Sequence, residues 1–335
     1  MRLPAPRGPL SEWVIELLAS DPAAEPPTPP VIEGDPLAGD DFHLALYVLH
    51  ELHYSSWEGV SDGWEWNVGQ LAFRQRLEAA FEGALRHAVP VPDAGAEGAG
   101  KRLTTLIAAD DGPSLSHHLG SRATREQFLE FLVHRSAYQL KEADPYVWVI
   151  PRLRGGPKAA LIEIEADEYG GGVESRMHST MYADTLAAAG LAAEPNAYVE
   201  LLPGVTLANV NVITMFGLQR RLRGAAIGHL AAFEMVSSQP SRRYSSGLSR
   251  LGFAPETTAF YDEHVEADSV HENIAAYDMA GGLARERPEL EPDLLWGATT
   301  LLYLEGRFAD RLLGCWELGE SSLLGPVESL APLPT

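Results

Sequence analysis

The chain has 335 residues, and its 45% of hydrophobic and 21% of charged residues are typical of a folded globular protein rather than a disordered one. Its formal net charge of −22 argues against nucleic acid or an anionic membrane as a partner, since both need a basic face, and no run approaches the roughly 20 apolar residues of a membrane span. Cys315, the one cysteine, excludes an intramolecular disulfide and a cysteine-based zinc site, and the start of the chain does not resemble a signal peptide, so we expect a cytoplasmic protein.

The N-terminal part is predicted to change character near residue 39. Residues 1–39 form an extension with a short amphipathic segment, 11–19, followed by a linker whose six prolines prevent a helix. From Asp40 onward the apolar residues follow helical spacing, which predicts helices over 40–57 and 66–87. A loop over 89–100 leads to a further helix over 101–109.

The rest of the chain is predicted to be helical as well. One helix begins at Ser121 or Thr124 and ends at Asp144, because a residue before proline is disfavoured in the α region. Further helices are expected over 157–189, 195–202, 206–217, 222–238, 241–251, 256–280 and 289–313, and Gly281-Gly282 is expected to end the helix over 256–280. With roughly ten helices and no convincing strand, the sequence predicts an all-α bundle over 40–316 and a loose tail over 317–335.

The helix over 256–280 carries a candidate metal-binding face. His264, Asp268 and His271 are spaced i, i+4 and i+7, so their side chains project from one side of a helix. Two imidazoles and a carboxylate suit a transition metal such as iron. Three polar residues also share an exposed helix face by chance, and this motif alone does not decide between the two interpretations.

Two plans for a helical iron protein predict different partners for this face. The ferritin-like plan takes two Glu-x-x-His pairs from facing helices. No Glu in this sequence is followed by a His three residues later, and the nearest substitutes use Asp268 with His271 and Asp40 with His43. The ferritin-like plan is therefore disfavoured.

The acidic and histidine residues instead resemble those of the haem-oxygenase-like diiron oxidases and oxygenases, also called iron-containing redox enzymes. That family has a lone Glu on one core helix, a Glu followed ten residues later by a His, a further Glu, and then His-x-x-x-Asp-x-x-His. The residues here that match in order and spacing, within about 126–284, are Glu142, Glu168, His178, Glu234, His264, Asp268 and His271. The last motif together with the spaced Glu/His pair is fairly specific.

The resemblance implies a haem-oxygenase-like helical bundle with seven ligands for two iron ions that alternate between Fe(II) and Fe(III), with O2 as co-substrate. It implies that Glu168 bridges the two ions. His178, His271 and Glu142 then complete one iron, and the other takes Glu234, His264 and Asp268.

Two local features of the sequence support this ligand set. Glu168 and His178 lie about −80° apart on an ideal helix, so both face one site only if the helix is distorted. The triplet 170–172 of glycines between them predicts that distortion, since each glycine costs roughly 1 kcal/mol in a helix relative to alanine. Glu234 is a lone carboxylate on an otherwise apolar helix and needs a partner such as a metal or an arginine.

Other polar residues compete for a role in the site. Glu174 is an alternative to Glu168 as the partner of His178, and His43, His50, Glu51 and His53 form a rival cluster that either binds metal or hydrogen-bonds within the core. His229 is expected to be a packed or partner-bonded histidine. The basic residues that either anchor a substrate carboxylate or pair with acidic surface residues are Arg220, Arg221, Arg223, Arg242 and Arg243.

The resemblance implies an O2-dependent oxidoreductase of specialised metabolism acting on a small molecule. N-oxygenation of an amine on an amino-acid-like substrate is the leading prediction. The alternatives are oxidative C–C cleavage, desaturation or decarboxylation of an amino acid or fatty acid. A prediction from another class is a non-catalytic, metal-binding helical protein. An external electron donor and a homodimer are family-level expectations.

Overall fold

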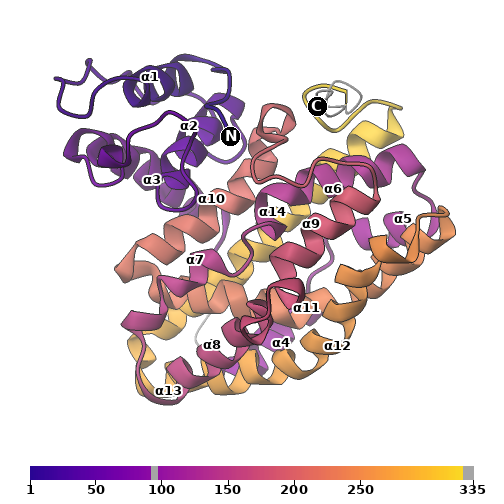
Figure 1. The fold of residues 1–335 in the computed structure, drawn as a ribbon. Helices are drawn as coiled ribbons and strands as arrows, with labels where there is room; N and C mark the ends of the chain where they lie inside the picture. The colour runs from indigo at the N-terminus through magenta and orange to yellow at the C-terminus, as the bar shows by residue number, and fades with distance from the viewer. Residues whose placement is uncertain (92–96, 327–335) are drawn as a thin grey trace.

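The computed structural model describes residues 1–91 and 97–326, apart from the side chains of residues 266–270. All regular structure in this part is helical, which confirms the predicted all-α fold (Figure 1). None of the described helices is long and apolar enough to cross a membrane. The α-helices, joined in places by single 3₁₀ turns, are α1 (Pro9–Leu18), α2 (Asp40–Glu51), α3 (Val68–Ala88), α4 (Ala99–Ala108), α5 (Leu115–Ser121), α6 (Arg125–Gln139), α7 (Asp144–Val147), α8 (Gly155–Glu168), α9 (His178–Ala188), α10 (Gly204–Leu218), α11 (Arg223–Arg250), α12 (Ala259–Asn273), α13 (Gly281–Glu286) and α14 (Glu291–Glu317).

The centre of the bundle is the pair α11 and α14, which cross with their backbones in contact (Figure 1). A Cβ on Gly228 of α11 would lie 1.7 Å from the backbone oxygen of Leu294, and a Cβ on Gly297 of α14 would lie 2.1 Å from that of Ala225. Only glycine fits at either position, because no side-chain atom can approach so closely. The close crossing fixes α11, on which Glu234 lies.

Helix α11 is continuous, although the sequence predicts two helices separated near Pro240. Pro240 lies inside the helix and cannot donate a hydrogen bond to the carbonyl of Val236. Both residues line the cavity described below, so the interruption in backbone bonding lies on the cavity side of α11.

Helix α1 packs against α2 and contributes Trp13, Val14 and Leu17 to the hydrophobic core. The backbone N–H groups of Leu10 and Ser11 donate to the carboxylate of Asp41 at 2.9 and 2.8 Å. A carboxylate at the first turn of a helix satisfies N–H groups that have no partner within the helix. The division into an extension over 1–39 and a domain from residue 40 stays a prediction.

The stretch predicted as one distorted helix over 157–189 consists of two helices. Helix α8 ends at Glu168, and Gly170, Gly171 and Gly172 have φ values of 61°, 61° and 82°, which favour glycine. A Cβ on Gly170 would also lie 2.5 Å from the backbone of Arg176. The chain turns here, and a new helix, α9, begins at residue 178.

The helix expected to end at Gly281-Gly282 continues instead to Glu286. A π-helical segment, Ile274–Ala280, follows α12 directly, and α13 follows that segment. Gly281 has an ordinary helical φ of −62°. A Cβ on Gly282 would lie 3.1 Å from Pro157, so that glycine serves close packing against α8 rather than termination. The expected helix over 195–202 shortens to the turn Val199–Leu201, and α5 was not predicted.

Candidate metal centre

Six of the seven predicted ligands converge between α6, α8, α9, α11 and α12. Each is buried, with 1–7% of its surface exposed, and they are Glu142, Glu168, His178, Glu234, His264 and His271. The side chain of Asp268, the seventh, lies outside the described residues, so its place in the site stays a prediction.

Four of these residues form a first group. One ligand atom from each of Glu142, Glu168, His178 and His264 lies within 4.8 Å of those of the other three. The distance from His264 Nε2 to Glu142 Oε2 is 3.6 Å, and that from His178 Nδ1 to Glu168 Oε2 is 2.8 Å. The two imidazole rings lie 4.4 Å apart between centroids. Two carboxylates and two imidazoles thus surround one position.

A second group consists of Glu168, Glu234 and His271, again with ligand atoms within 4.8 Å of one another. His271 Nδ1 lies 3.3 Å from Glu234 Oε2. Because Glu168 belongs to both groups, its carboxylate lies between two adjacent positions at which an ion would have several ligands.

The two histidines of α12 are exchanged relative to the expected division. The resemblance implied that His271 shares an iron with Glu142 and His178, and that His264 shares the other with Glu234. The geometry instead groups His264 with Glu142 and His178, and His271 with Glu234. Two turns, about 10 Å along the axis, separate the histidines. The first turns of α12 lie against α9, where Phe260 contacts His178, whereas its last turns continue toward α8.

Each α12 histidine is held by its other ring nitrogen. His264 Nδ1 donates to the backbone oxygen of Phe260 at 2.8 Å, and His271 Nε2 donates to Asp167 Oδ2 at 2.9 Å. Such partners fix the orientation of a ligating imidazole. The sequence analysis missed Asp167, whose only signal is its position directly before Glu168.

Glu142 has a partner of its own on α6. The Gln139 amide, in the orientation that satisfies its hydrogen bonds, donates to both carboxylate oxygens at 2.8 and 2.9 Å. This contact holds the carboxylate in the turn between α6 and α7, where the backbone is no longer helical.

The electrostatics of the site favour a cation. Burial, together with Glu142 and Glu234, raises the pKa of Glu168 well above its ordinary value. Burial and the neighbouring His264 lower the pKa of His178 to about 4. Burial would lower the pKa of His271 too, but the carboxylates of Glu234 and Asp167 outweigh it and raise that pKa to about 9.

Hydrogen bonding within the protein leaves the site incomplete. Glu168 Oε2 and His178 Nδ1 lie 2.8 Å apart but not in hydrogen-bonding geometry, and Glu234 Oε2 is likewise buried without a hydrogen bond. No arginine or lysine of the described residues forms an ion pair with Glu168 or Glu234. A buried carboxylate without a cation is costly, and oxygen and imidazole ligands suit iron, so the residues present fit two iron ions.

Glu165 is a further buried carboxylate that the sequence analysis missed. It lies one turn before Glu168 on the buried face of α8, with 4% of its surface exposed and no hydrogen bond to either oxygen. Burial, then Glu168 and Glu234, raise its pKa to about 9. The spacing of these two acids beside Leu161 and Ile164, on the apolar face, was the available signal.

A cavity of about 220 Å³ reaches the first group at His264. Its walls come from α6, α11, α12, α14 and the α4–α5 connection, and they are mostly apolar, with Phe131, Phe233, Phe260 and Leu301 among them. This lining provides space for a small molecule beside the group.

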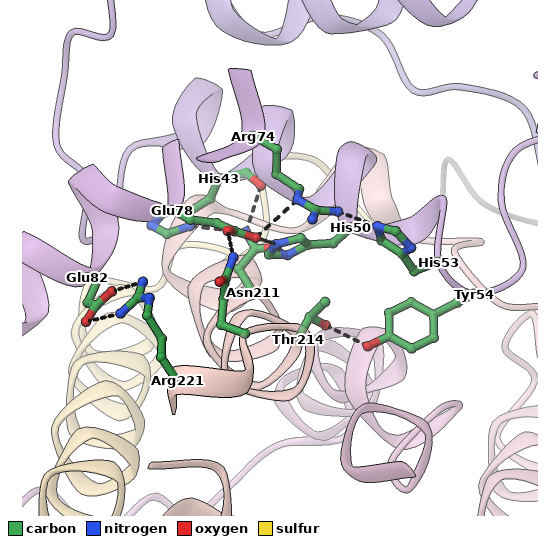
Figure 2. A network of polar contacts seen from close by, with 11 residues as sticks. His43, His50, His53, Tyr54, Arg74, Glu78, Glu82, Asn211, Thr214 and Arg221 are labelled. Carbon is green, nitrogen blue, oxygen red and sulfur yellow. Dashed lines mark hydrogen bonds and ion pairs between the residues drawn. The ribbon is translucent and has the colours of Figure 1, made fainter. Parts of the chain in front are cut away.

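The rival histidine cluster belongs to a hydrogen-bonded network between α2, α3 and α10 (Figure 2). His50 lies 3.1 Å from both Asn211 Oδ1 and Glu78 Oε1, whereas His53 contacts Glu65 and Arg74. Glu51 points elsewhere, toward Asn196 and Lys141, and His43 lies 3.2 Å from Asn211. Among the described residues these four side chains do not surround one position, which agrees with the hydrogen-bonded interpretation.

The remaining candidates lie apart from the centre. Glu174 is exposed, and His229 accepts a hydrogen bond from Tyr146 at 2.9 Å. Arg221 pairs bidentately with Glu82, and Arg243 donates to Ser116 (Figure 2 shows the Arg221 pair). The residues that line the cavity include none of the arginines proposed as carboxylate anchors.

Residues 129–306, just over half of the chain, match the family described as iron-containing redox enzymes. The chain belongs to this family. The matched stretch contains all seven predicted ligand positions, and membership makes the protein an iron-containing oxidoreductase with a haem-oxygenase-like helical fold.

The chain is also similar in sequence to a curated protein, the nitrosourea synthase of Streptomyces achromogenes subsp. streptozoticus. It is 25% identical over 173 residues, which cover 52% of this chain and 37% of that protein. The similarity therefore extends over little more than a third of the relative.

Proposed function

We propose that this iron-containing oxidoreductase is a non-haem diiron oxidase or oxygenase that uses O2 to oxidise a small molecule. The observation that carries the proposal is the position of Glu168, which belongs to both groups of converging ligands. A carboxylate has two oxygens and can bind two cations at once. A single metal position would not need two groups with a shared member.

The proposed ligands follow the observed grouping. Glu142, His178 and His264 would hold one iron, Glu234 and His271 would hold the other, and Glu168, which belongs to both groups, would contribute to both. Asp268 is proposed as the seventh ligand because it lies on the helix face between the two histidines, one turn after His264.

Two bound iron ions would supply the redox chemistry that activates O2, which no side chain supplies alone. The protein's own residues position and isolate the site. Asp167 and the Phe260 carbonyl orient the imidazoles, while Phe131, Phe233 and Phe260 give the substrate side an apolar surface. Gln139 holds Glu142 in the turn that faces α12.

N-oxygenation of an amine on an amino-acid-like substrate is the proposed reaction. The name of the curated relative refers to a nitrosourea, which favours nitrogen as the oxidised atom. Oxidative C–C cleavage, desaturation or decarboxylation is the second candidate, because the apolar cavity wall beside His264 also suits a hydrocarbon chain. An external electron donor and a homodimer belong to the proposal as family-level expectations.

Anaerobic titration with Fe(II), followed by metal analysis after gel filtration, tests the ligand set. The wild type is expected to bind close to two irons per chain, and Glu168→Gln at most one. The matched control is Glu174→Gln, since Glu174 lies six residues further along the chain and is exposed. Equal iron content in Glu168→Gln and the wild type would contradict the bridging role.

Mixing the ferrous protein with oxygenated buffer tests the chemistry. The proposal predicts O2 uptake in proportion to the iron content and a transient change in visible absorbance. The substrate should make this absorbance change decay faster. A protein that binds iron without either response is a non-catalytic metal-binding protein, the alternative from another class.

A further inference from the structure

An ion pair lies in the mostly apolar wall of the cavity that reaches His264, whose lining also includes Asp110. Arg135 of α6 and Glu305 of α14 face each other there, with Arg135 Nη1 donating to Glu305 Oε1 at 2.7 Å and Nη2 to Oε2 at 2.5 Å. Their side chains are 15% and 29% exposed. The guanidinium carbon also lies 4.6 Å from the ring centre of Phe308 and 5.6 Å from that of Phe131. The ion pair is therefore rigidly placed in a partly desolvated wall.

Arg135 is aligned with the metal centre along α6. Arg135 and Gln139 are spaced i and i+4 on α6, so they lie on one side of the helix. Gln139 in turn donates to both carboxylate oxygens of Glu142 in the turn that follows. Arg135, Gln139 and His264 all line the cavity. A molecule in this cavity thus has the charged pair near one end and the first ligand group near the other.

We propose that Arg135 and Glu305 bind the zwitterionic head group of the substrate, with Arg135 donating to its carboxylate and Glu305 accepting from its ammonium group. The assignment rests on the proposed function, because it takes the His264 end of the cavity as the place of reaction. It identifies these two as specificity-determining residues and places the oxidised atom at the end of the substrate remote from the head group.

The pairing of the two residues favours a zwitterion over a simple acid or amine. A substrate carboxylate that takes Arg135 alone leaves the Glu305 carboxylate without its cation, and an amine that takes Glu305 leaves the guanidinium unpaired. Loss of one partner from a desolvated pair is costly. A zwitterion supplies both missing charges and keeps the bidentate geometry that arginine forms with a carboxylate.

The size of the cavity points to the same class of ligand. Its volume of about 220 Å³ lies below the roughly 300–1,000 Å³ of pockets for drug-sized ligands. A free amino acid is small enough for this volume.

Binding measurements on the whole chain test the proposal. We would use isothermal titration calorimetry on the metal-free protein and on the anaerobic Fe(II) protein. The probes are L-lysine and three six-carbon ligands that differ only in the head group: L-norleucine, hexanoate and hexylamine. The wild type is expected to bind the two amino acids at least tenfold more tightly than hexanoate or hexylamine.

The variants separate the two halves of the head group. Arg135→Gln is expected to weaken amino acids and hexanoate at least tenfold, whereas hexylamine, which no longer leaves a guanidinium unpaired, should bind at least as tightly as to the wild type. Glu305→Gln is expected to weaken amino acids and hexylamine, whereas hexanoate should bind at least as tightly as to the wild type, and Arg135→Lys should restore part of the affinity. The matched control is Arg221→Gln, which breaks a bidentate arginine–glutamate pair between two other elements, away from the cavity, and is expected to bind all four ligands as the wild type does.

Two results would overturn the assignment: hexanoate binding as tightly as L-norleucine, or Arg135→Gln binding both amino acids like the wild type. If the pair only fastens α6 to α14, both variants lower the thermal unfolding temperature without changing the head-group preference, which also overturns it. Should Arg135→Gln fail to fold, Glu305→Gln and Arg135→Lys still decide the outcome. Two bound irons with no amino-acid binding would refute the head-group assignment alone, whereas failure to bind iron would refute the proposed function, with the head-group preference still read in the metal-free protein.

Discussion

Two regions of this molecule bury histidines among glutamates, yet the two have opposite electrostatics. In the network of α2, α3 and α10, burial alone would raise the pKa of Glu78, but His50 and Arg74 lower it below its ordinary value, and Gln219 donates to it at 2.6 Å. In the candidate metal centre, burial and neighbouring carboxylates raise the pKa of Glu168. The first region pairs its buried carboxylate with a guanidinium and an amide donor, whereas no arginine or lysine of the described residues pairs with Glu168 or Glu234.

This difference shows that the number of buried histidines and glutamates does not by itself identify a metal site. His50 and Glu78 are as deeply buried as His178 and Glu168, but their polar atoms are used within the protein (Figure 2). What marks the metal centre is a surplus of buried acceptors whose charge no arginine or lysine of the described chain balances.

The largest effect on stability is expected when the network of α2, α3 and α10 loses its buried carboxylate. Glu78→Leu leaves the buried Arg74 guanidinium without its ion-pair partner and is expected to lower the free energy of unfolding by about 3–5 kcal/mol. Urea denaturation would measure the loss. Glu163→Gln, on the exposed side of α8, is the control and should stay within about 0.5 kcal/mol of the wild type. A loss below about 1 kcal/mol for Glu78→Leu would mean that the network does not need its anion.

Fe(II) is expected to stabilise the protein through the candidate metal centre and not through the network of α2, α3 and α10. Fe(II) at 100 times its dissociation constant should stabilise the folded wild type by about 2.7 kcal/mol for each occupied iron site, because it binds the native state. Glu168→Gln should lose most of this increase, and Glu78→Gln should keep it. Anaerobic thermal unfolding with and without Fe(II) measures both. An equal increase in both variants would place the iron elsewhere.

Glu165, in the metal centre, should make the stability of the metal-free protein depend on pH. Its raised pKa of about 9 means that, between an ordinary value near 4.5 and 9, the metal-free folded state keeps a proton that the unfolded state has released. Its contribution is therefore constant below pH 4.5 and is lost as the pH rises toward 9, by up to about 1.4 kcal/mol per pH unit. Glu165→Gln should remove this slope, as seen in urea denaturation of the metal-free protein from pH 5 to 9. Parallel curves for variant and wild type would refute the raised pKa.

The smallest effect on stability is expected at the glycine turn between α8 and α9, which brings Glu168 and His178 together. Gly171→Ala places a side chain in open space but at a φ of 61°, so it should cost only about 1–2 kcal/mol of stability through backbone strain. Iron stoichiometry should not change. Gly170→Ala is the contrasting variant, since its Cβ would overlap the backbone of Arg176, and it should lower iron content as well as stability. Equal behaviour of the two alanines would refute this distinction.

The fold class followed from helical spacing, because apolar periodicity reports which face of a segment is buried. The same periodicity does not report which helix lies opposite. The division of His264 and His271 between two irons came from the family resemblance instead, and the geometry groups these two side chains the other way round. Arg135 and Glu305 escaped notice for a related reason: each is one charged residue on an amphipathic helix, and only their meeting across α6 and α14 gives them a role. Arg242 and Arg243 attracted attention as an adjacent pair, although they lie outside the cavity wall.

The glycine reversal between α8 and α9 also changes how the ten-residue separation of Glu168 and His178 should be understood. That separation is the length of a loop, not a multiple of a helical repeat. Extra residues at Gly171 or Gly172, where the surrounding space is open, would lengthen the loop without rotating either ligand. One residue inserted between His264 and His271 would instead turn the second imidazole by about 100°. A signature for such centres should therefore allow insertions and deletions in the first interval and forbid them in the second.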